Sequence, residues 1–142
     1  MLKGISKLIS PELIKILMEM GHGDEIVIAD GNFPAASHAA RLVRADGHDI
    51  SELLKAILQL LPLDTYSEHP VGLMAVVAGD PVETPIWEVY QSIVDESAER
   101  SISIEQIERF AFYERARKAY AVIATGEGAL YANIILKKGV IA

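Results

Sequence analysis

The run Glu25-Ile26-Val27-Ile28-Ala29-Asp30 has the length and apolar composition of a strand buried on both faces, and it ends in a carboxylate. It is preceded by Gly21-His22-Gly23-Asp24, in which the glycines let the backbone turn sharply. Further upstream, Ser10-Pro11-Glu12 is typical of a helix start, because serine caps helices well and proline suits the first helical position. The sequence therefore predicts a helix that stops at the first of these glycines and leads into a buried strand.

Other strands and helices alternate with this unit along the chain. Apolar runs of strand length lie at residues 40–45, 73–78, 119–125 and 132–137. Helices are expected over residues 53–61, 85–98 and 106–118. Asp49 or Ser51 is expected to cap the first of these helices. The helix over residues 85–98 is expected to pack its apolar face against the core, with the side chains of Ile86, Val89, Tyr90 and Ile93. This order predicts an α/β fold in which residues 1–142 form a single domain, with a mixed sheet of about five or six strands flanked by helices.

The 142-residue chain is 51% hydrophobic and carries 20 acidic and 13 basic side chains, for a formal net charge of −7. Because phosphate binding needs Lys and Arg to displace counterions, this balance argues against a nucleic-acid partner, and it also disfavours an anionic membrane surface. No run approaches the roughly 18 consecutive apolar residues expected of a membrane helix. The apolar excess favours extra burial between copies of the chain, so we expect a homo-oligomer.

The chain contains no cysteine, which excludes disulfides, thiolate nucleophiles and cysteine-ligated metal sites. This composition fits a reducing cytoplasm, where we expect the protein to act. The spacings of His38, His48 and His69 match no dense metal-ligand motif, so no metal site is predicted.

Two polar side chains flank the predicted buried strand and are candidates for chemistry. An unperturbed imidazole titrates near 6.5, so His22, accessible between glycines, can exchange protons at neutral pH. Asp30 ends the strand, where open α/β sheets often place ligand-binding groups. The competing interpretation is structural, with His22 as a turn residue and Asp30 as the cap of the following loop.

The segment Tyr131-Ala132-Asn133 enters the last predicted strand. In an extended chain residues two apart point to the same side, so Tyr131 and Asn133 are expected to project together and offer groups of the kind that bind sugars. Arg109, in the charged and aromatic run at residues 108–115, could grip a hydroxyl or a carboxylate with its planar guanidinium. A strand-edge tyrosine, a turn asparagine and ordinary helix packing are the structural alternatives.

Six short segments share their order and spacing with a known family. They are Ile9-Ser10-Pro11-Glu12-Leu13, Gly21-His22-Gly23-Asp24-Glu25, Ala29-Asp30, Arg109-Phe110-Ala111-Phe112-Tyr113-Glu114-Arg115-Ala116, Thr125-Gly126-Glu127 and Tyr131-Ala132-Asn133-Ile134-Ile135-Leu136-Lys137-Lys138-Gly139-Val140. Together they resemble the ribose pyranase / fucose mutarotase family over nearly the whole chain. The segment at residues 109–116 is more similar to the fucose branch than to the ribose branch.

The resemblance implies a ribose pyranase-like fold and an enzyme that interconverts the anomers of an unphosphorylated monosaccharide, above all L-fucose. By motif, His22 matches the catalytic histidine, whereas Asp30 and Arg109 match substrate-binding residues. Tyr131, Ala132 and Asn133 match the final sugar-contacting segment, and Tyr131 is expected to act in catalysis as a proton relay as well. The family also implies no metal and no organic cofactor, and a toroidal decamer with sites near the subunit boundaries.

The chain departs from the family pattern in the loop after Asp30. Here Gly31-Asn32-Phe33-Pro34 lacks the histidine that fucose-type sequences often carry just before the Phe-Pro pair. Residues 68–99 also match less well. These departures bear on which sugar is used, so two alternatives stay open: a ribose-type pyranase that exchanges pyranose and furanose forms, and a monosaccharide-binding or transport-accessory protein without catalysis.

Overall fold

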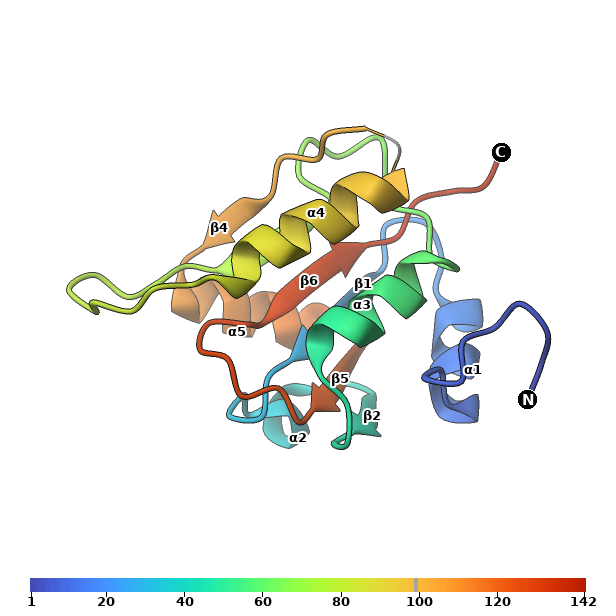
Figure 1. Ribbon diagram of the computed structural model, residues 1–142, viewed down its shortest axis with the longest axis horizontal. Coiled ribbons are helices and arrows are strands. Elements are labelled where there is room, and N and C mark those ends of the chain that lie inside the picture. The colour runs from blue at the N-terminus through green and yellow to red at the C-terminus, as the bar shows by residue number, and fades with distance from the viewer. Residues whose placement is uncertain (99) are drawn as a thin grey trace.

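The computed structural model describes residues 1–98 and 100–142. Within these residues six strands form one sheet in the order β2-β5-β1-β6-β3-β4 (Figure 1). The strands are β1 (Glu25–Ala29), β2 (Leu42–Ala45), β3 (Val71–Met74), β4 (Glu105–Ile107), β5 (Ala121–Thr125) and β6 (Ile134–Lys137). The helices are α1 (Pro11–Glu19), α2 (Ala35–His38), α3 (Ile50–Leu58), α4 (Ile86–Ala98) and α5 (Arg109–Lys118). The predicted α/β fold with a mixed sheet is therefore confirmed.

β1 lies in the middle of the sheet and has a different kind of neighbour on each side. β5 runs parallel to it, whereas β6 runs antiparallel, with Ile28 of β1 opposite Ile134 and Glu25 opposite Lys137. The antiparallel pairing puts the end of β1 beside the start of β6, and the start of β1 beside the end of β6. His22 and Asp30, the candidate residues on either side of the buried strand, lie toward these two ends.

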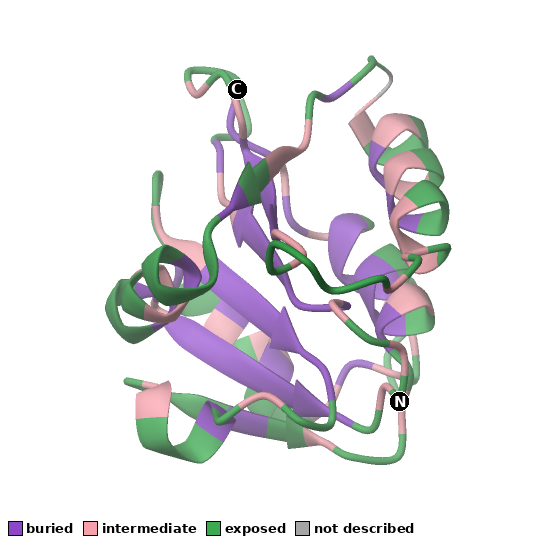
Figure 2. Cartoon of the chain, turned by 90° about the vertical axis from the view of Figure 1, so that its left-hand side faces the viewer, coloured by how far each residue is buried: buried purple, intermediate pink, exposed green. Residues whose placement is uncertain are grey.

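Helices cover both faces of the sheet. Ile26 and Ile28 belong to an apolar cluster with α1, α3 and α4, whereas Val27 and Ala29 belong to a second cluster with α2 and α5. The strands form a largely buried layer between partly exposed helices (Figure 2). Because β1 is covered on both faces, it needs the continuous apolar sequence that identified it.

α1 begins as the sequence predicts. Ser10 Oγ accepts a hydrogen bond from the Leu13 N–H at 3.1 Å, and proline occupies the first helical position. After the helix the chain turns through Gly23, whose φ of 87° lies in the region that favours glycine. The helix-to-strand unit around residues 10–30 is thus predicted correctly.

The N-terminus of α3 differs from the prediction, because neither Asp49 nor Ser51 supplies the cap. Asp49 occupies the cap position but makes no side-chain cap hydrogen bond. The Ile50 N–H instead donates to Glu127 Oε1 at 3.1 Å, from a residue 77 positions away in the chain. A tertiary contact therefore replaces the local cap, and the helix begins three residues earlier than residue 53.

The prediction for residues 73–78 is wrong in its limits. The strand there is β3, at Val71–Met74, and the chain leaves the sheet after Met74. β2, β5 and β6 are where the sequence predicts strands, and each begins two residues later than expected. The short helix α2 was not predicted.

The helix predicted over residues 106–118 begins only at Arg109. The Glu108 carboxylate accepts hydrogen bonds from the backbone N–H groups of Phe110 and Ala111, which caps α5 at that point. The residues just before this cap form β4, an edge strand that runs parallel to β3. Such a short strand leaves no periodic signal, because its hydrogen bonds come from a partner elsewhere in the chain.

α4 forms where it is expected, but one of its inward residues is wrong. Tyr90 is fully buried, and Ile86 and Ile93 pack against the core as predicted. Val89 is 47% exposed, and Val94 takes the buried position instead. In the described part of the chain, no helix is both long and apolar enough to cross a bilayer.

β5 ends in a close contact that requires glycine. The Gly126 N–H donates to the His48 carbonyl at 3.1 Å, and a Cβ at Gly126 would overlap the carbonyl oxygen of Asp46. We expect Gly126→Ala to lower the free energy of unfolding by about 1–3 kcal/mol, because the overlap is with backbone that cannot rotate away. Urea denaturation followed by circular dichroism measures the change.

Gly128→Ala is the matched control, because a Cβ at Gly128 meets no heavy atom within 4 Å. We expect this variant to stay within about 1 kcal/mol of the wild type. Equal loss of stability in the two variants would contradict the assigned contact.

Candidate active site

A hollow of about 370 Å³ opens where β1 ends and β6 begins. This volume lies near the lower end of the range of about 300–1,000 Å³ that is usual for small-molecule sites. Its lining includes four residues predicted from the sequence, Asp30, Arg109, Tyr131 and Asn133. The other lining residues are Asn32, Phe33, Met74, Val77, Asp80, Tyr113 and Leu130. The fold thus gathers polar side chains from segments far apart in the sequence.

Asp30 and Asn133 are tied to each other at the end of the β1–β6 pair. The Asp30 N–H donates to Asn133 Oδ1 at 2.7 Å. Both residues are buried, at 7% and 5% exposed. Because this bond uses the amide oxygen of Asn133, its NH2 group is the part that can donate to a ligand.

The Asp30 carboxylate is an acceptor in a partly dry environment. Burial raises the pKa of Asp30, and the backbone N–H groups of Asn32, Phe33 and Ala132 partly oppose this by favouring the charged form. The Asn32 N–H donates to Asp30 Oδ1 at 3.0 Å. A fixed carboxylate with lone pairs to spare suits a ligand that presents hydroxyl groups.

Tyr131 lies in the left-handed backbone region, with a φ of 53°. This conformation is uncommon for a residue other than glycine, and it persists where the surroundings fix it. Here the Trp87 indole N–H donates to the Tyr131 carbonyl, and the Tyr90 hydroxyl donates to the Ala132 carbonyl, both at 2.8 Å. α4 therefore anchors the backbone of this segment through two hydrogen bonds.

The expected reason for the proximity of Tyr131 and Asn133 is wrong. Both line the hollow, but β6 begins at Ile134, so the segment before it is not an extended strand. The left-handed residue makes the chain turn there. Ala132 is fully buried and is not among the lining residues, so its part in the site is that of backbone.

The Tyr131 hydroxyl is bonded to a second carboxylate. It donates to Asp80 Oδ2 at 2.7 Å, and this hydrogen bond raises the pKa of Tyr131. The same hydroxyl accepts from the Val77 N–H at 3.4 Å. A neutral hydroxyl that touches a carboxylate can pass a proton to or from a ligand.

Arg109 is the first residue of α5 and lies exposed at the rim of the hollow. Its Nε–H donates to the Tyr113 hydroxyl at 3.2 Å, and its guanidinium lies 5.6 Å from the ring centroid of Phe110. These contacts direct the planar group while its terminal N–H groups can still donate to a hydroxyl.

His22 does not lie in this hollow. It precedes β1 whereas Asp30 follows it, and five residues of strand at about 3.3 Å each separate the two ends by about 16 Å. His22 Nε2 lies 3.0 Å from Asp64 Oδ1, and its ring centroid lies 5.3 Å from that of Tyr66.

The predicted site residues therefore fall into two separate groups within one chain, and His22 brings with it two residues that were not predicted, Asp64 and Tyr66. We call them the His22 half-site, which consists of His22, Asp64 and Tyr66, and the Asp30 half-site, which consists of Asp30, Arg109, Tyr131 and Asn133. No histidine lies among the lining residues of the hollow in the part of the chain that the structure describes.

Two carboxylates with partners in these half-sites were missed by sequence reasoning. Neither Asp80 nor Asp64 was named as a site residue from the sequence. Asp80 bonds Tyr131 across 51 residues, and Asp64 bonds His22 across 42 residues. Local sequence holds no signal of such partners, so neither residue could have been found from one sequence.

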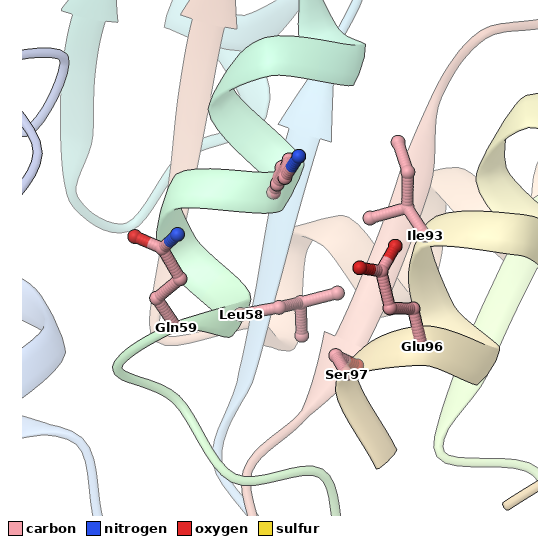
Figure 3. Close-up of a pocket in the computed structure, with 6 residues that line it drawn as sticks. Leu58, Gln59, Ile93, Glu96 and Ser97 are labelled. Atoms are coloured by element: carbon pink, nitrogen blue, oxygen red, sulfur yellow. The ribbon is translucent and has the colours of Figure 1, made fainter. Parts of the chain in front are cut away.

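A second hollow, of about 330 Å³, lies between α3 and α4 (Figure 3). Leu58 and Ile93 supply its apolar part, whereas Gln59, Glu96 and Ser97 are exposed. The Gln59 and Glu96 groups there are the ends of exposed, rotatable side chains, and the Ser97 hydroxyl already donates to the Val94 carbonyl. A ligand site needs fixed polar groups, so we assign the candidate active site to the end of β1.

The fold and the site define a small α/β protein with a polar hollow suited to an uncharged, hydroxyl-rich ligand and with a separate imidazole–carboxylate pair. Among residues 1–98 and 100–142, no three His, Asp or Glu side chains could together hold a metal ion. A family model described as the RbsD / FucU transport protein family matches residues 3–141. The chain belongs to this family.

Several named proteins are similar to this chain. It is 56% identical to fucose mutarotase of Mus musculus, over 97% of this chain and 94% of the mouse protein. The structure of FucU from Bifidobacterium longum matches with a TM-score of 0.96 at 59% identity, covering 99% of this chain and 100% of that one. A fucose mutarotase from Streptococcus pneumoniae, solved in complex with L-fucose, matches with a TM-score of 0.91 at 52% identity, with 99% and 100% covered.

The ribose branch of the family is more distant. RbsD from Bacillus subtilis, solved with D-ribose, matches with a TM-score of 0.77 at 25% identity, and both chains are covered completely, at 100%. The fold implied by the resemblance is therefore confirmed, and the fucose branch is the nearer of the two, as residues 109–116 indicated.

Because burial raises the pKa of Asp30 in the native state, ionisation of this carboxyl group destabilises the native state relative to the unfolded chain. Between the ordinary value of 3.8 and the higher native value, the native state binds more protons than the unfolded chain, so stability falls as pH rises. We expect the unfolding free energy of the wild type to fall relative to that of Asp30→Asn as pH rises from about 4, and the difference to level off above the native pKa. Urea denaturation of both proteins at a series of pH values tests this, and parallel curves would contradict it.

Proposed function

We propose that this protein interconverts the α and β anomers of L-fucose by ring opening and closing. The observation that carries the proposal is the Asp30 half-site, in a chain whose close relatives are named fucose mutarotases. Its fixed groups include a carboxylate acceptor, amide and guanidinium donors and a tyrosine ring. These groups suit an uncharged monosaccharide, which has many hydroxyls and no charge to neutralise.

The reaction needs only proton transfers. Ring opening breaks the bond between the anomeric carbon and the ring oxygen, so that the anomeric hydroxyl loses a proton and the ring oxygen gains one. Closing on the other face of the aldehyde reverses both transfers. An imidazole near neutrality can serve as acid or base, so we assign His22 this role and assign the second proton to Tyr131 with Asp80.

The other residues of the Asp30 half-site bind the sugar in this proposal. Asp30 accepts hydrogen bonds from sugar hydroxyls, whereas Arg109 and the NH2 group of Asn133 donate to them. Ala132 fixes the backbone between the two side chains that line the hollow, through its carbonyl bond to Tyr90.

His22 and the Asp30 half-site lie at opposite ends of β1, so we propose that a catalytic centre combines the two half-sites from neighbouring subunits of a decamer. Exposed apolar side chains beside both half-sites support a subunit boundary there. Tyr66, next to His22, is 78% exposed, and Phe110, next to Arg109, is 67% exposed. We further propose that residues 1–142 act as one domain and that the enzyme works in the cytoplasm, a location that the absence of cysteine supports.

Saturation-transfer NMR on L-fucose tests the activity. Wild-type protein should speed exchange between the two anomers, whereas His22→Gln should slow it by about 10²–10⁴-fold with the fold intact by circular dichroism. Unchanged exchange in the presence of wild-type protein would overturn the proposal.

A sugar panel separates the alternatives in the same experiment. Faster exchange of the furanose signal of D-ribose would identify a ribose-type pyranase. Binding of L-fucose by calorimetry with exchange at the buffer rate would identify a binding protein without catalysis.

Mixing two inactive variants tests the shared centre. Equal amounts of His22→Gln and Asp30→Asn chains, assembled together, should regain about a quarter of the wild-type rate, because random mixing pairs two intact half-sites in that fraction of centres. The matched control mixes Asp30→Asn with Arg109→Ala, which damage the same half-site and should regain nothing. Failure of the first mixture in confirmed mixed oligomers would place both residues in a centre formed by one chain.

A further inference from the structure

The imidazole of His22 is bonded to the carboxylate of Asp64, which has no role in the proton transfers proposed above. His22 Nε2 lies 3.0 Å from Asp64 Oδ1, and the Tyr66 N–H also donates to this oxygen, at 3.2 Å. The His22 side chain is 46% exposed, whereas that of Asp64 is 5% exposed. An accessible imidazole is thus fixed at one nitrogen by a buried acceptor.

The backbone around this pair is built to hold the two residues in place. The last residue of β6 and the two residues that follow it lie between their loops and bond to both. On one side the Gly23 N–H donates to the Lys138 carbonyl at 2.8 Å. On the other side the Asp64 N–H donates to the Lys137 carbonyl at 3.0 Å, and the Gly139 N–H donates to the Pro62 carbonyl at 2.8 Å.

Gly139 shows how closely the second loop is packed against this segment. A Cβ there would lie 2.7 Å from the Leu63 carbonyl oxygen and 2.8 Å from Asp64 Cα. The position of Asp64 relative to His22 is therefore set by main-chain contacts from both sides of one short segment. A chance surface contact would lack such support.

Asp64 is in its charged form at neutral pH. Burial opposes ionisation, but the hydrogen bonds from His22 and from the Tyr66 and Ser67 backbone outweigh it and lower the pKa of Asp64. An ionised carboxylate can only accept hydrogen bonds. The His22 nitrogen that faces it must therefore donate, which assigns the proton of neutral His22 to Nε2.

We infer that Asp64 is a positioning residue for the reaction, which holds His22 as the Nε2–H tautomer so that Nδ1 is the nitrogen that exchanges a proton with the sugar. The inference rests on the proposed function. Nδ1 takes the proton of the anomeric hydroxyl, or gives one to the ring oxygen, while the Nε2–H bond to Asp64 stays intact. The imidazolium formed in between lies beside a negative charge, which stabilises it.

The other charged or titratable groups around the pair belong to four segments of the chain. Asp24 lies in the loop of His22 and its Oδ2 accepts from the Gly21 N–H at 2.7 Å. Tyr66 lies beside the ring, and the Arg100 guanidinium donates to the Asp64 carbonyl at 3.4 Å. Lys138 donates its Nζ–H to the Gly139 carbonyl at 3.2 Å. None of these four groups bonds to the imidazole in the described structure, whereas Asp64 contacts its Nε2.

The test begins with the wild-type protein alone. Long-range ¹H–¹⁵N NMR of selectively ¹⁵N-labelled histidine should show His22 as the Nε2–H tautomer above its pKa. A signal from the Nδ1–H tautomer would overturn the inference without any substitution.

Asp64→Asn then removes the charge at constant shape. We expect kcat for anomer exchange to fall at least about tenfold with KM little changed, and the limb of the pH profile that reports His22 to move to lower pH. The NMR titration of His22 should move in the same direction. Asp64→Glu keeps the carboxylate, so it should retain more of the wild-type rate than Asp64→Asn does. This variant also supplies the comparison if Asp64→Asn is poorly folded.

Asp49→Asn is the matched control, because Asp49 is exposed and makes no side-chain cap bond. This variant should keep the wild-type rate and pH profile. A lower rate for Asp64→Asn with an unchanged tautomer and an unchanged His22 titration would mean a structural role and would overturn the inference. A wild type that fails to exchange anomers would instead refute the proposed function, while the NMR data still decide whether Asp64 fixes His22.

Discussion

The antiparallel pairing of β1 with β6 is the constraint on which both half-sites depend. It sets the Asp30 end of one strand beside the Asn133 end of the other, where the two residues share a 2.7 Å hydrogen bond. At the opposite end the same pairing sets the His22 loop beside the segment that follows β6. A shift in this register would separate Asp30 from Asn133 at one end and the His22 loop from its partner segment at the other, so both half-sites require it.

Each half-site is completed by a residue from a loop that only the sheet brings near. The chain after β3 supplies Asp80 to Tyr131, and the chain after α3 supplies Asp64 to His22. No buried side-chain nitrogen or oxygen of the described residues lacks a hydrogen-bond partner. Satisfied networks of this kind fix the orientation of their members, which is what proton transfer and hydroxyl recognition require.

Prediction from sequence succeeded where local rules decide. The start of α1 follows from a serine cap and a proline, and β1 follows from a continuous apolar run. It failed where a distant partner decides, as at β4, whose hydrogen bonds come from β3, and at α3, whose first N–H is bonded by Glu127. For the site, Asp30, Arg109, Tyr131 and Asn133 were predicted and line one hollow, whereas Asp64 and Asp80 were not found.

The sequence by itself determined the chemical groups and the family: an imidazole between glycines, a carboxylate at the end of a buried strand, and a final segment with a tyrosine and an asparagine. Only the tertiary structure decided which of these groups meet. His22 and Asp30 are eight positions apart in the chain, but the strand between them is extended, so they lie at opposite ends of β1. Asp30 and Asn133 are 103 residues apart and yet share a hydrogen bond, because strand pairing, and not distance along the chain, sets which side chains are neighbours.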